Sequence, residues 1–128
     1  MEIPTPPIPS PALTGEDRLW GAVAHFSALS MYLTGIGFVV GPLIIWLWKR
    51  GTSTFAAEEA REALNFNLSV LIYYAVSGVL CLTIILIPLI LVLLALLHAF
   101  HLICIIVAGL KASDGIPFRY PLNLRLVK

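Results

Sequence analysis

The chain has 128 residues, of which 59% are hydrophobic and only 12% are charged, and its formal net charge is +1. A water-soluble domain of this size needs more polar side chains to cover its surface, so the composition predicts a membrane protein. The low net charge, and the lack of a basic run interleaved with aromatic residues, exclude nucleic acid as an expected partner.

The N-terminal residues 1–14, MEIPTPPIPSPALT, contain five prolines and neither Lys nor Arg. They lack the basic and apolar regions of a secretory signal peptide. This composition predicts a disordered, Pro-rich tail, with a ligand for a groove of another protein as the alternative. The remaining residues, 15–128, are expected to form one transmembrane helical domain.

The first apolar stretch runs from Trp20 to Trp48. As one helix it would be about 43 Å long, which exceeds the roughly 30 Å of a bilayer's hydrocarbon core. Thr34, Gly35 and Gly37 interrupt it, and Pro42 interrupts it again. Two interpretations remain open from these residues: one tilted, broken span, or two short helices, about 18–33 and 38–49, in a re-entrant hairpin.

The next helix is expected over about residues 55–84, because Ser53 and Thr54 offer capping hydroxyls. Acidic side chains in its first turns favour the positive end of the helix, and we expect them to form a solvated helix start. These acidic residues are Glu58, Glu59 and Glu62.

No charged residue occurs from Ala63 to Leu110, a run about twice the length of one membrane span. The chain must therefore fold back, and Pro88 suits the first turn of a following helix over about 88–111. The sequence thus predicts an all-α, polytopic transmembrane bundle of four helices, of which the first two are short.

Polar and small residues inside the apolar stretches are candidates for packing between helices. Amides at membrane depth must find hydrogen-bond partners because lipid offers none, and small residues four apart allow helices to approach closely. The candidates are Asn65, Asn67, Gly37 and Gly41, with a kink at Pro42 as the alternative for the two glycines.

Three histidines are the only residues that suggest a cofactor. His98 and His101 are three apart on a predicted helix, Cys104 follows at the same spacing, and His25 could add a ligand from another helix. No carboxylate is available among the apolar spans to complete or orient such a site. The default interpretation is therefore neutral histidines hydrogen-bonded between helices, with no metal or cofactor, and haem or metal binding is the alternative.

Basic residues follow the first apolar stretch and the last one, which places the loop 49–55 and the C-terminus in the cytoplasm by the positive-inside rule. We expect the protein in a bacterial plasma membrane, where the side of the N-terminus depends on whether the first stretch is a hairpin. Amphipathic residues expected at the headgroup level are Trp20, Trp48, Lys49, Arg50, Arg119 and Tyr120.

Three stretches are more specific than hydropathy: GEDRLWGAVAHFSAL, EAREALNFNLSVLIY and GLKASDGIPFRYPLNLRLVK. Together they resemble small bacterial membrane proteins of unassigned function that are grouped with a chloroplast protein-import component, the Tic-twenty-like family. The most specific pieces are Glu62-Ala63-Leu64-Asn65-Phe66 and Arg119-Tyr120-Pro121-Leu122 with Arg125. The resemblance implies a four-helix membrane domain, favours the hairpin, and implies a role near protein translocation. It transfers no catalytic residue, and Glu59-Ala60 stands where many relatives carry His-Gly.

The sequence also lacks the residues that most enzymes and pumps need. It has no carboxylate pair at membrane depth, no H-E-x-x-H and no G-x-S-x-G. We therefore expect a non-enzymatic interaction or assembly component, whose partners are the lipid bilayer and other membrane proteins or copies of itself. A small haem or metal redox protein and an oligomeric pore are the alternatives.

Overall fold

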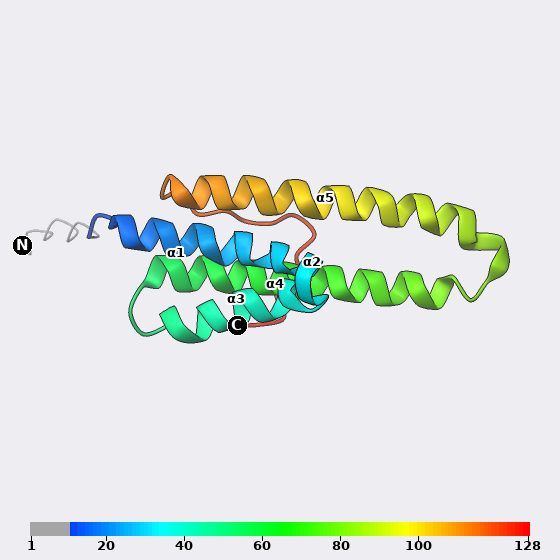
Figure 1. Cartoon of the computed structure of the whole chain (residues 1–128), viewed down its shortest axis with the longest axis horizontal. Coiled ribbons are helices and arrows are strands. Elements are labelled where there is room, and N and C mark those ends of the chain that lie inside the picture. The colour runs from blue at the N-terminus through cyan, green and yellow to red at the C-terminus, as the bar shows by residue number, and fades with distance from the viewer. Residues whose placement is uncertain (1–10) are drawn as a thin grey trace, which may run out of the picture.

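The computed structural model describes residues 11–128, and this part of the chain is helical without any strand (Figure 1). The predicted all-α fold with four helical arms is confirmed. Most of the predicted N-terminal tail, residues 1–10, lies outside the described residues. The elements are α1 (Gly15–Phe26), the 3₁₀ turn η1 (Ser27–Ser30), α2 (Met31–Thr34), α3 (Gly37–Lys49), α4 (Thr54–Leu80), the 3₁₀ turn η2 (Ile84–Leu86) and α5 (Ile87–Ser113).

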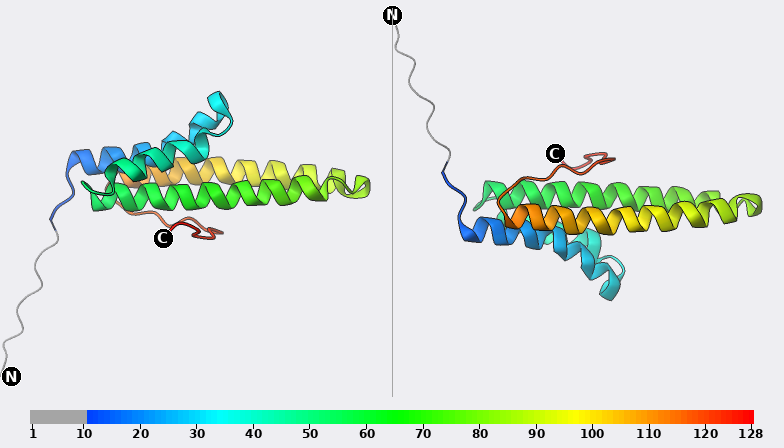
Figure 2. Two further views of the ribbon diagram at one scale, coloured as in Figure 1. Left: turned by 90° about the horizontal axis from the view of Figure 1, so that it is seen from below. Right: turned by 90° about the horizontal axis from the view of Figure 1, so that it is seen from above.

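The first apolar stretch is a hairpin. The path through α1, η1 and α2 ends at Gly35, whose φ of 74° reverses the chain into α3. The 13 residues of α3 rise about 20 Å, which is too short for a bilayer core of about 30 Å. The tip of the hairpin also diverges from the long axis of the other helices (Figure 2).

Small residues allow the two arms of this hairpin to touch. A Cβ atom on Gly37 would lie 2.1 Å from the Ser30 hydroxyl oxygen, and one on Gly41 would lie 2.8 Å from the Ser27 hydroxyl oxygen. Both glycines therefore pack inside the hairpin, against η1. Pro42 is accommodated within α3.

The helices α4 and α5 are long and apolar enough to span a membrane, and they are the two of this kind among residues 11–128. The Ser53 hydroxyl caps α4 by accepting a hydrogen bond from the Ala56 amide. The turn between the spans precedes α5, and Pro88 lies in the first turn of that helix, where its missing amide hydrogen costs nothing.

The short helix α1 packs against both α4 and α5 over the half of the bundle nearest the chain termini (Figure 1). Close contact depends on Gly109, where an added Cβ atom would lie 2.5 Å from the Phe26 ring. Beyond α2, the distal halves of the two spans extend alone. Their side chains are largely exposed there, including Val76, Val79, Leu80, Leu89, Leu91, Val92, Leu93 and Leu96.

The last fifteen residues, 114–128, are not helical and run back along the bundle on the side opposite the hairpin tip (Figure 2). Gly115, with a φ of 77°, starts this return at the end of α5. Leu122 and Arg125 adopt positive φ values of 56° and 48°, which are uncommon outside glycine and reverse the direction of the segment. We call residues 116–128 the C-terminal segment.

Candidate functional site

Two acidic residues of α4 are buried where the C-terminal segment covers them. Glu59 is 2% exposed and Glu62 is 4% exposed, so the expectation of a solvated helix start is wrong for both. Glu58, one position before, is exposed as expected. The preference of acidic residues for the first turns of a helix is a local effect. Here Glu59 and Glu62 are buried because the C-terminal segment packs over them and supplies hydrogen-bond donors.

Glu59 joins three elements through hydrogen bonds. Its Oε2 atom lies 2.8 Å from Nε2 of His25 on α1, and it also accepts from the Phe118 amide at 3.3 Å. The other ring nitrogen of His25, Nδ1, lies 2.8 Å from the Tyr120 hydroxyl. His25 is 0% exposed and Tyr120 is 3% exposed, so this chain of Tyr, His and Glu is sealed inside the bundle.

The Tyr120 hydroxyl is protonated and so is able to act as a donor in these hydrogen bonds. Burial raises the pKa of Tyr120 well above its ordinary value, with Cys104, Glu59 and Glu62 adding to the effect. The hydroxyl therefore keeps its proton and can donate it to His25 Nδ1, which leaves the Nε2 hydrogen of His25 for the Glu59 carboxylate. The Tyr120 ring also stacks on Phe66 at 4.0 Å between ring centroids.

Glu62 is the counter-charge for the C-terminal segment. Its carboxylate accepts a hydrogen bond from the Tyr120 amide at 2.9 Å, and it lies 3.4 Å from the Arg119 guanidinium. The Arg125 guanidinium reaches the other carboxylate oxygen at 3.5 Å. The positive φ of Arg125 makes this possible, because the segment turns back and brings its second arginine to the same acid.

Further along α4, polar side chains hold the rest of the segment. Asn65 donates to the Val127 carbonyl at 2.8 Å and accepts from the Val127 amide. The Ser69 hydroxyl accepts from the Leu124 amide at 2.8 Å, and the Tyr73 hydroxyl donates to the Leu122 carbonyl at 2.6 Å. Asn65 was predicted to bond another helix, and its partner is instead the C-terminal segment.

The histidines of α5 turn to separate partners. His98 lies 2.9 Å from the Tyr32 hydroxyl and 3.1 Å from the Tyr74 hydroxyl, whereas Nε2 of His101 lies 2.6 Å from Asn67 Oδ1. Among residues 11–128, no group of three His, Cys, Asp or Glu side chains is placed to hold a metal ion. The contacts of His98 and His101 match the default interpretation of histidines hydrogen-bonded between helices.

The residues predicted at the headgroup level separate into two sets. Trp20 and Trp48 lie edge to face at 4.8 Å, with the Lys49 ammonium 4.5 Å from the centroid of the Trp20 ring and 2.9 Å from Glu16. Arg50 and Arg119 remain exposed at the same end of the bundle. Tyr120, in contrast, belongs to the buried network and not to the surface.

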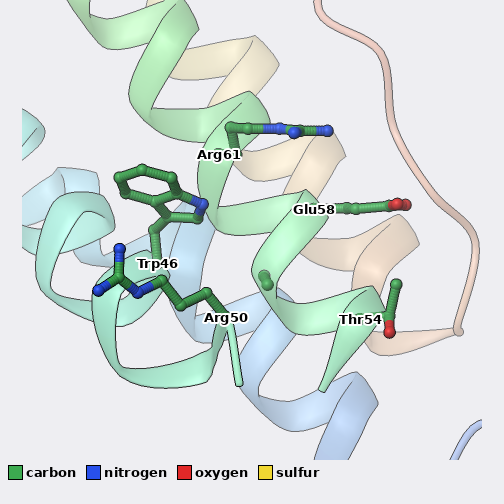
Figure 3. A pocket seen from close by; sticks show the side chains of 6 residues that line it. Trp46, Arg50, Thr54, Glu58 and Arg61 are labelled. Atoms are coloured by element: carbon green, nitrogen blue, oxygen red, sulfur yellow. The ribbon is translucent and has the colours of Figure 1, made fainter. Parts of the chain in front are cut away.

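A shallow cavity of about 200 Å³ lies beside these residues, between the end of α3 and the start of α4 (Figure 3). Its side chains do not converge on one point. The Arg50 guanidinium lies under Trp46, with its central carbon 5.9 Å from the ring centroid, whereas Arg61 and Glu58 extend from α4 to the side on which the C-terminal segment passes.

The Tyr120–His25–Glu59 network was not predicted from the sequence. One signal could have indicated it: the polar residues Glu59, Glu62, Ser69 and Tyr73 recur at helical spacing and so share one face of α4. A polar face that continues into a membrane span needs a polar partner, and the only polar stretch left unassigned was the C-terminal one.

The fold and the buried network define a class of protein: a small helical membrane protein whose C-terminal segment is locked onto its first long span. Over residues 16–127 the sequence matches the magnetosome magnetite crystal formation protein family, and because this is nearly the whole chain, the protein belongs to that family. No curated protein and no solved structure matches the chain.

The family corrects the resemblance to the Tic-twenty-like import proteins, which is wrong. The two pieces that suggested it, around Glu62 to Phe66 and around Arg119 to Leu122, are the ones that dock on each other here. The contacts between these two pieces hold the C-terminal segment against α4. Such a packing motif carries no information about protein import.

Proposed function

We propose that this protein is a non-enzymatic component of the magnetosome membrane that influences magnetite crystal formation by assembling with other membrane proteins or with copies of itself. Its membership of the magnetosome family and its two apolar spans support a place in that membrane. The observation that supports assembly is that most apolar side chains on the distal halves of α4 and α5 are not covered by the rest of residues 11–128, so they are open to lipid and to neighbouring membrane helices.

The distribution of charge supports an indirect effect on the mineral. Every charged side chain of the described residues lies in the half of the bundle that contains α1, and none occurs between Ala63 and Leu110. The turn at the other end, residues 81–86, and the hairpin turn 35–36, part of the way along the spans, offer no carboxylate. Iron ions prefer charged oxygen, imidazole or thiolate ligands, and the Cys81 thiol is the one side chain of these types in the two turns.

The same distribution gives an orientation. The positive-inside rule favours the basic end in the cytoplasm, so we expect the turn 81–86 to face the interior of the magnetosome and the hairpin turn 35–36 to lie within the membrane. Because the first two helices form a hairpin, the start of α1 lies on the cytoplasmic side too. In this orientation, the charged end, where the C-terminal segment packs against α4, faces the cytoplasm and is available to partners there.

The proposal is tested by gene replacement in a magnetosome-forming bacterium whose own copy of this gene is deleted. Restoring the wild-type chain should restore crystal size and number, as measured by electron microscopy. Crystals that are unaltered by the deletion would overturn the proposal.

A photo-crosslinker at Leu93, which is 52% exposed on α5, tests assembly in the same cells. It should capture membrane proteins or a second copy of the chain, and these should be identified by mass spectrometry. The matched control is Ile105 on the same helix, which is 0% exposed and should capture only segments of its own chain. Adducts to lipid alone at Leu93 would contradict assembly through this surface.

A further inference from the structure

A second cavity, of about 320 Å³, lies between α4 and the C-terminal segment. It is separate from the cavity of Figure 3, although Arg61 borders both. Its lining is strongly basic: Arg61, Arg119, Arg125 and Lys128 surround Glu62, with Asn65 and Val127 completing the wall.

The charge around this cavity does not balance. Glu62 is the one carboxylate in its lining, and it already faces Arg119 and Arg125. Arg61 has no carboxylate within 4 Å among residues 11–128, and it extends towards the side of the C-terminal segment (Figure 3). The four basic side chains of the lining, Arg61, Arg119, Arg125 and Lys128, thus surround one acidic side chain, so positive charge is in excess around the cavity.

Two of the arginines, Arg119 and Arg125, are oriented by Glu62 before any ligand arrives. Glu62 is 5% exposed at its side chain, so it is a fixed anchor, whereas the side chains of Arg119 and Arg125 are 70% and 51% exposed. Each of these two guanidinium groups therefore contacts Glu62 through one nitrogen, and its other N–H groups remain available to a ligand. The positive φ of Arg125 turns the segment so that both arginines border the same space.

The depth of the cavity in the membrane follows from helix geometry. Twenty helical residues rise about 30 Å, the thickness of a hydrocarbon core. A core that begins at the end of α4, at Leu80, therefore ends near Arg61. The basic cavity lies at the level where phospholipid phosphates are found, on the side that carries the protein's other charges.

We propose that Arg61, Arg119 and Arg125 bind a phosphate group, and that this group is the headgroup phosphate of an anionic phospholipid. Guanidinium groups pair with phosphate through two parallel hydrogen bonds, and basic pockets beside membrane helices bind anionic headgroups. The surplus of positive charge selects a lipid with net negative charge over a zwitterionic one. This inference does not depend on the role in crystal formation.

Binding is measured on the purified full-length chain in detergent, as the rise in melting temperature when lipid is added. Phosphatidylglycerol should stabilise the wild-type chain at lower concentration than phosphatidylcholine. Arg61→Gln should weaken the effect of phosphatidylglycerol roughly tenfold, which corresponds to the loss of one charge-assisted contact. This variant breaks no ion pair within the described chain, so the fold should be retained.

Arg50→Gln is the matched control, because it removes the same charge at the same end of the bundle but from the cavity of Figure 3. It should leave the preference for phosphatidylglycerol within about twofold, the scale of a nonspecific surface charge. Equal losses in Arg50→Gln and Arg61→Gln would overturn the site in favour of general surface attraction. Stabilisation by inorganic phosphate, with no preference for phosphatidylglycerol, would overturn the assignment of the ligand to a lipid.

Discussion

The two buried carboxylates of α4 are neutralised in different ways. Glu59 receives hydrogen bonds from a histidine and a backbone amide, whereas Glu62 receives them from Arg119 and a backbone amide and also forms an ion pair with Arg125. A buried carboxylate without such partners would cost several kcal/mol, so each acid requires the C-terminal segment in place. The folding of the last thirteen residues is therefore tied to that of α4.

Removing the Tyr120 hydroxyl tests the buried network at the smallest scale. Tyr120→Phe keeps the ring stacked on Phe66 but leaves His25 Nδ1 without a partner at 0% exposure. We expect a loss of about 1–3 kcal/mol in the free energy of unfolding, measured by thermal denaturation in detergent. Tyr32→Phe is the control, because Tyr32 is 60% exposed and its loss should cost less.

Asp17 gives a pH dependence. Its carboxylate accepts hydrogen bonds from the Ser53 hydroxyl at 2.5 Å and from the hydroxyl and amide of Thr14, and these lower the pKa of Asp17 below its ordinary value of 3.8. Because the folded pKa lies below the unfolded one, the contribution to stability is complete above about pH 4 and disappears as the pH falls through the folded pKa.

The melting temperature of the wild-type chain should therefore fall more steeply below pH 4 than that of Asp17→Asn, whose side chain does not titrate. Comparing the two chains removes the contribution of the other carboxylates, which they share. Parallel acid curves would show that the link between Asp17 and Ser53 adds nothing to stability.

At the scale of elements, the contact between α1 and α5 depends on the absence of a side chain at Gly109. In Gly109→Ala, the new methyl group would lie 2.5 Å from the Phe26 ring, and relieving that overlap should cost about 1–3 kcal/mol of unfolding free energy. Gly78→Ala is the matched control on α4, where nothing lies within 4 Å of the new atom, and it should be neutral or slightly stabilising. Equal melting temperatures in the two variants would contradict this packing.

The attachment of the C-terminal segment is tested by limited proteolysis. Glu62→Gln weakens the ion pairs of both Arg119 and Arg125, so trypsin should cleave after Arg125 about tenfold faster, which corresponds to roughly 1.4 kcal/mol less cost of local opening. Mass spectrometry of the fragments measures the rate. Glu58→Gln, on an exposed residue of the same helix, should cleave at the wild-type rate.

The spans could be predicted from sequence because their causes are local. The run without charge from Ala63 to Leu110 exceeds one bilayer thickness, and Pro88 marks where a helix can restart. The site could not be predicted in the same way, because Glu59 and Tyr120 are 61 positions apart and only the fold brings them together. The polar face that Glu59 and Glu62 share with Ser69 and Tyr73 indicates that α4 has a polar partner, but it does not identify Tyr120 or His25 as that partner.

At the scale of the whole molecule, the partly exposed thiol of Cys81 can be used to measure how the protein is oriented in the membrane. Cys81 lies in the turn after α4, whereas Cys104 is buried, so a membrane-impermeant maleimide should react with Cys81 alone. Labelling should be slow in intact magnetosomes and fast after the membrane is opened with detergent, if the turn faces the interior. Fast labelling of intact magnetosomes would reverse the orientation, and Cys81→Ser is the control that should not be labelled.

The hairpin of α1 to α3 ends part of the way along the two spans, and this gives the molecule a tapered profile (Figure 2). In the orientation proposed above, the leaflet at the charged end holds four helical arms and the C-terminal segment, whereas of residues 11–128 the opposite leaflet holds α4 and α5. A protein with unequal cross-sectional areas in the two leaflets acts as a wedge. Many copies side by side would favour a bilayer that bends away from its wider, charged end, which is the curvature of a small closed vesicle seen from outside.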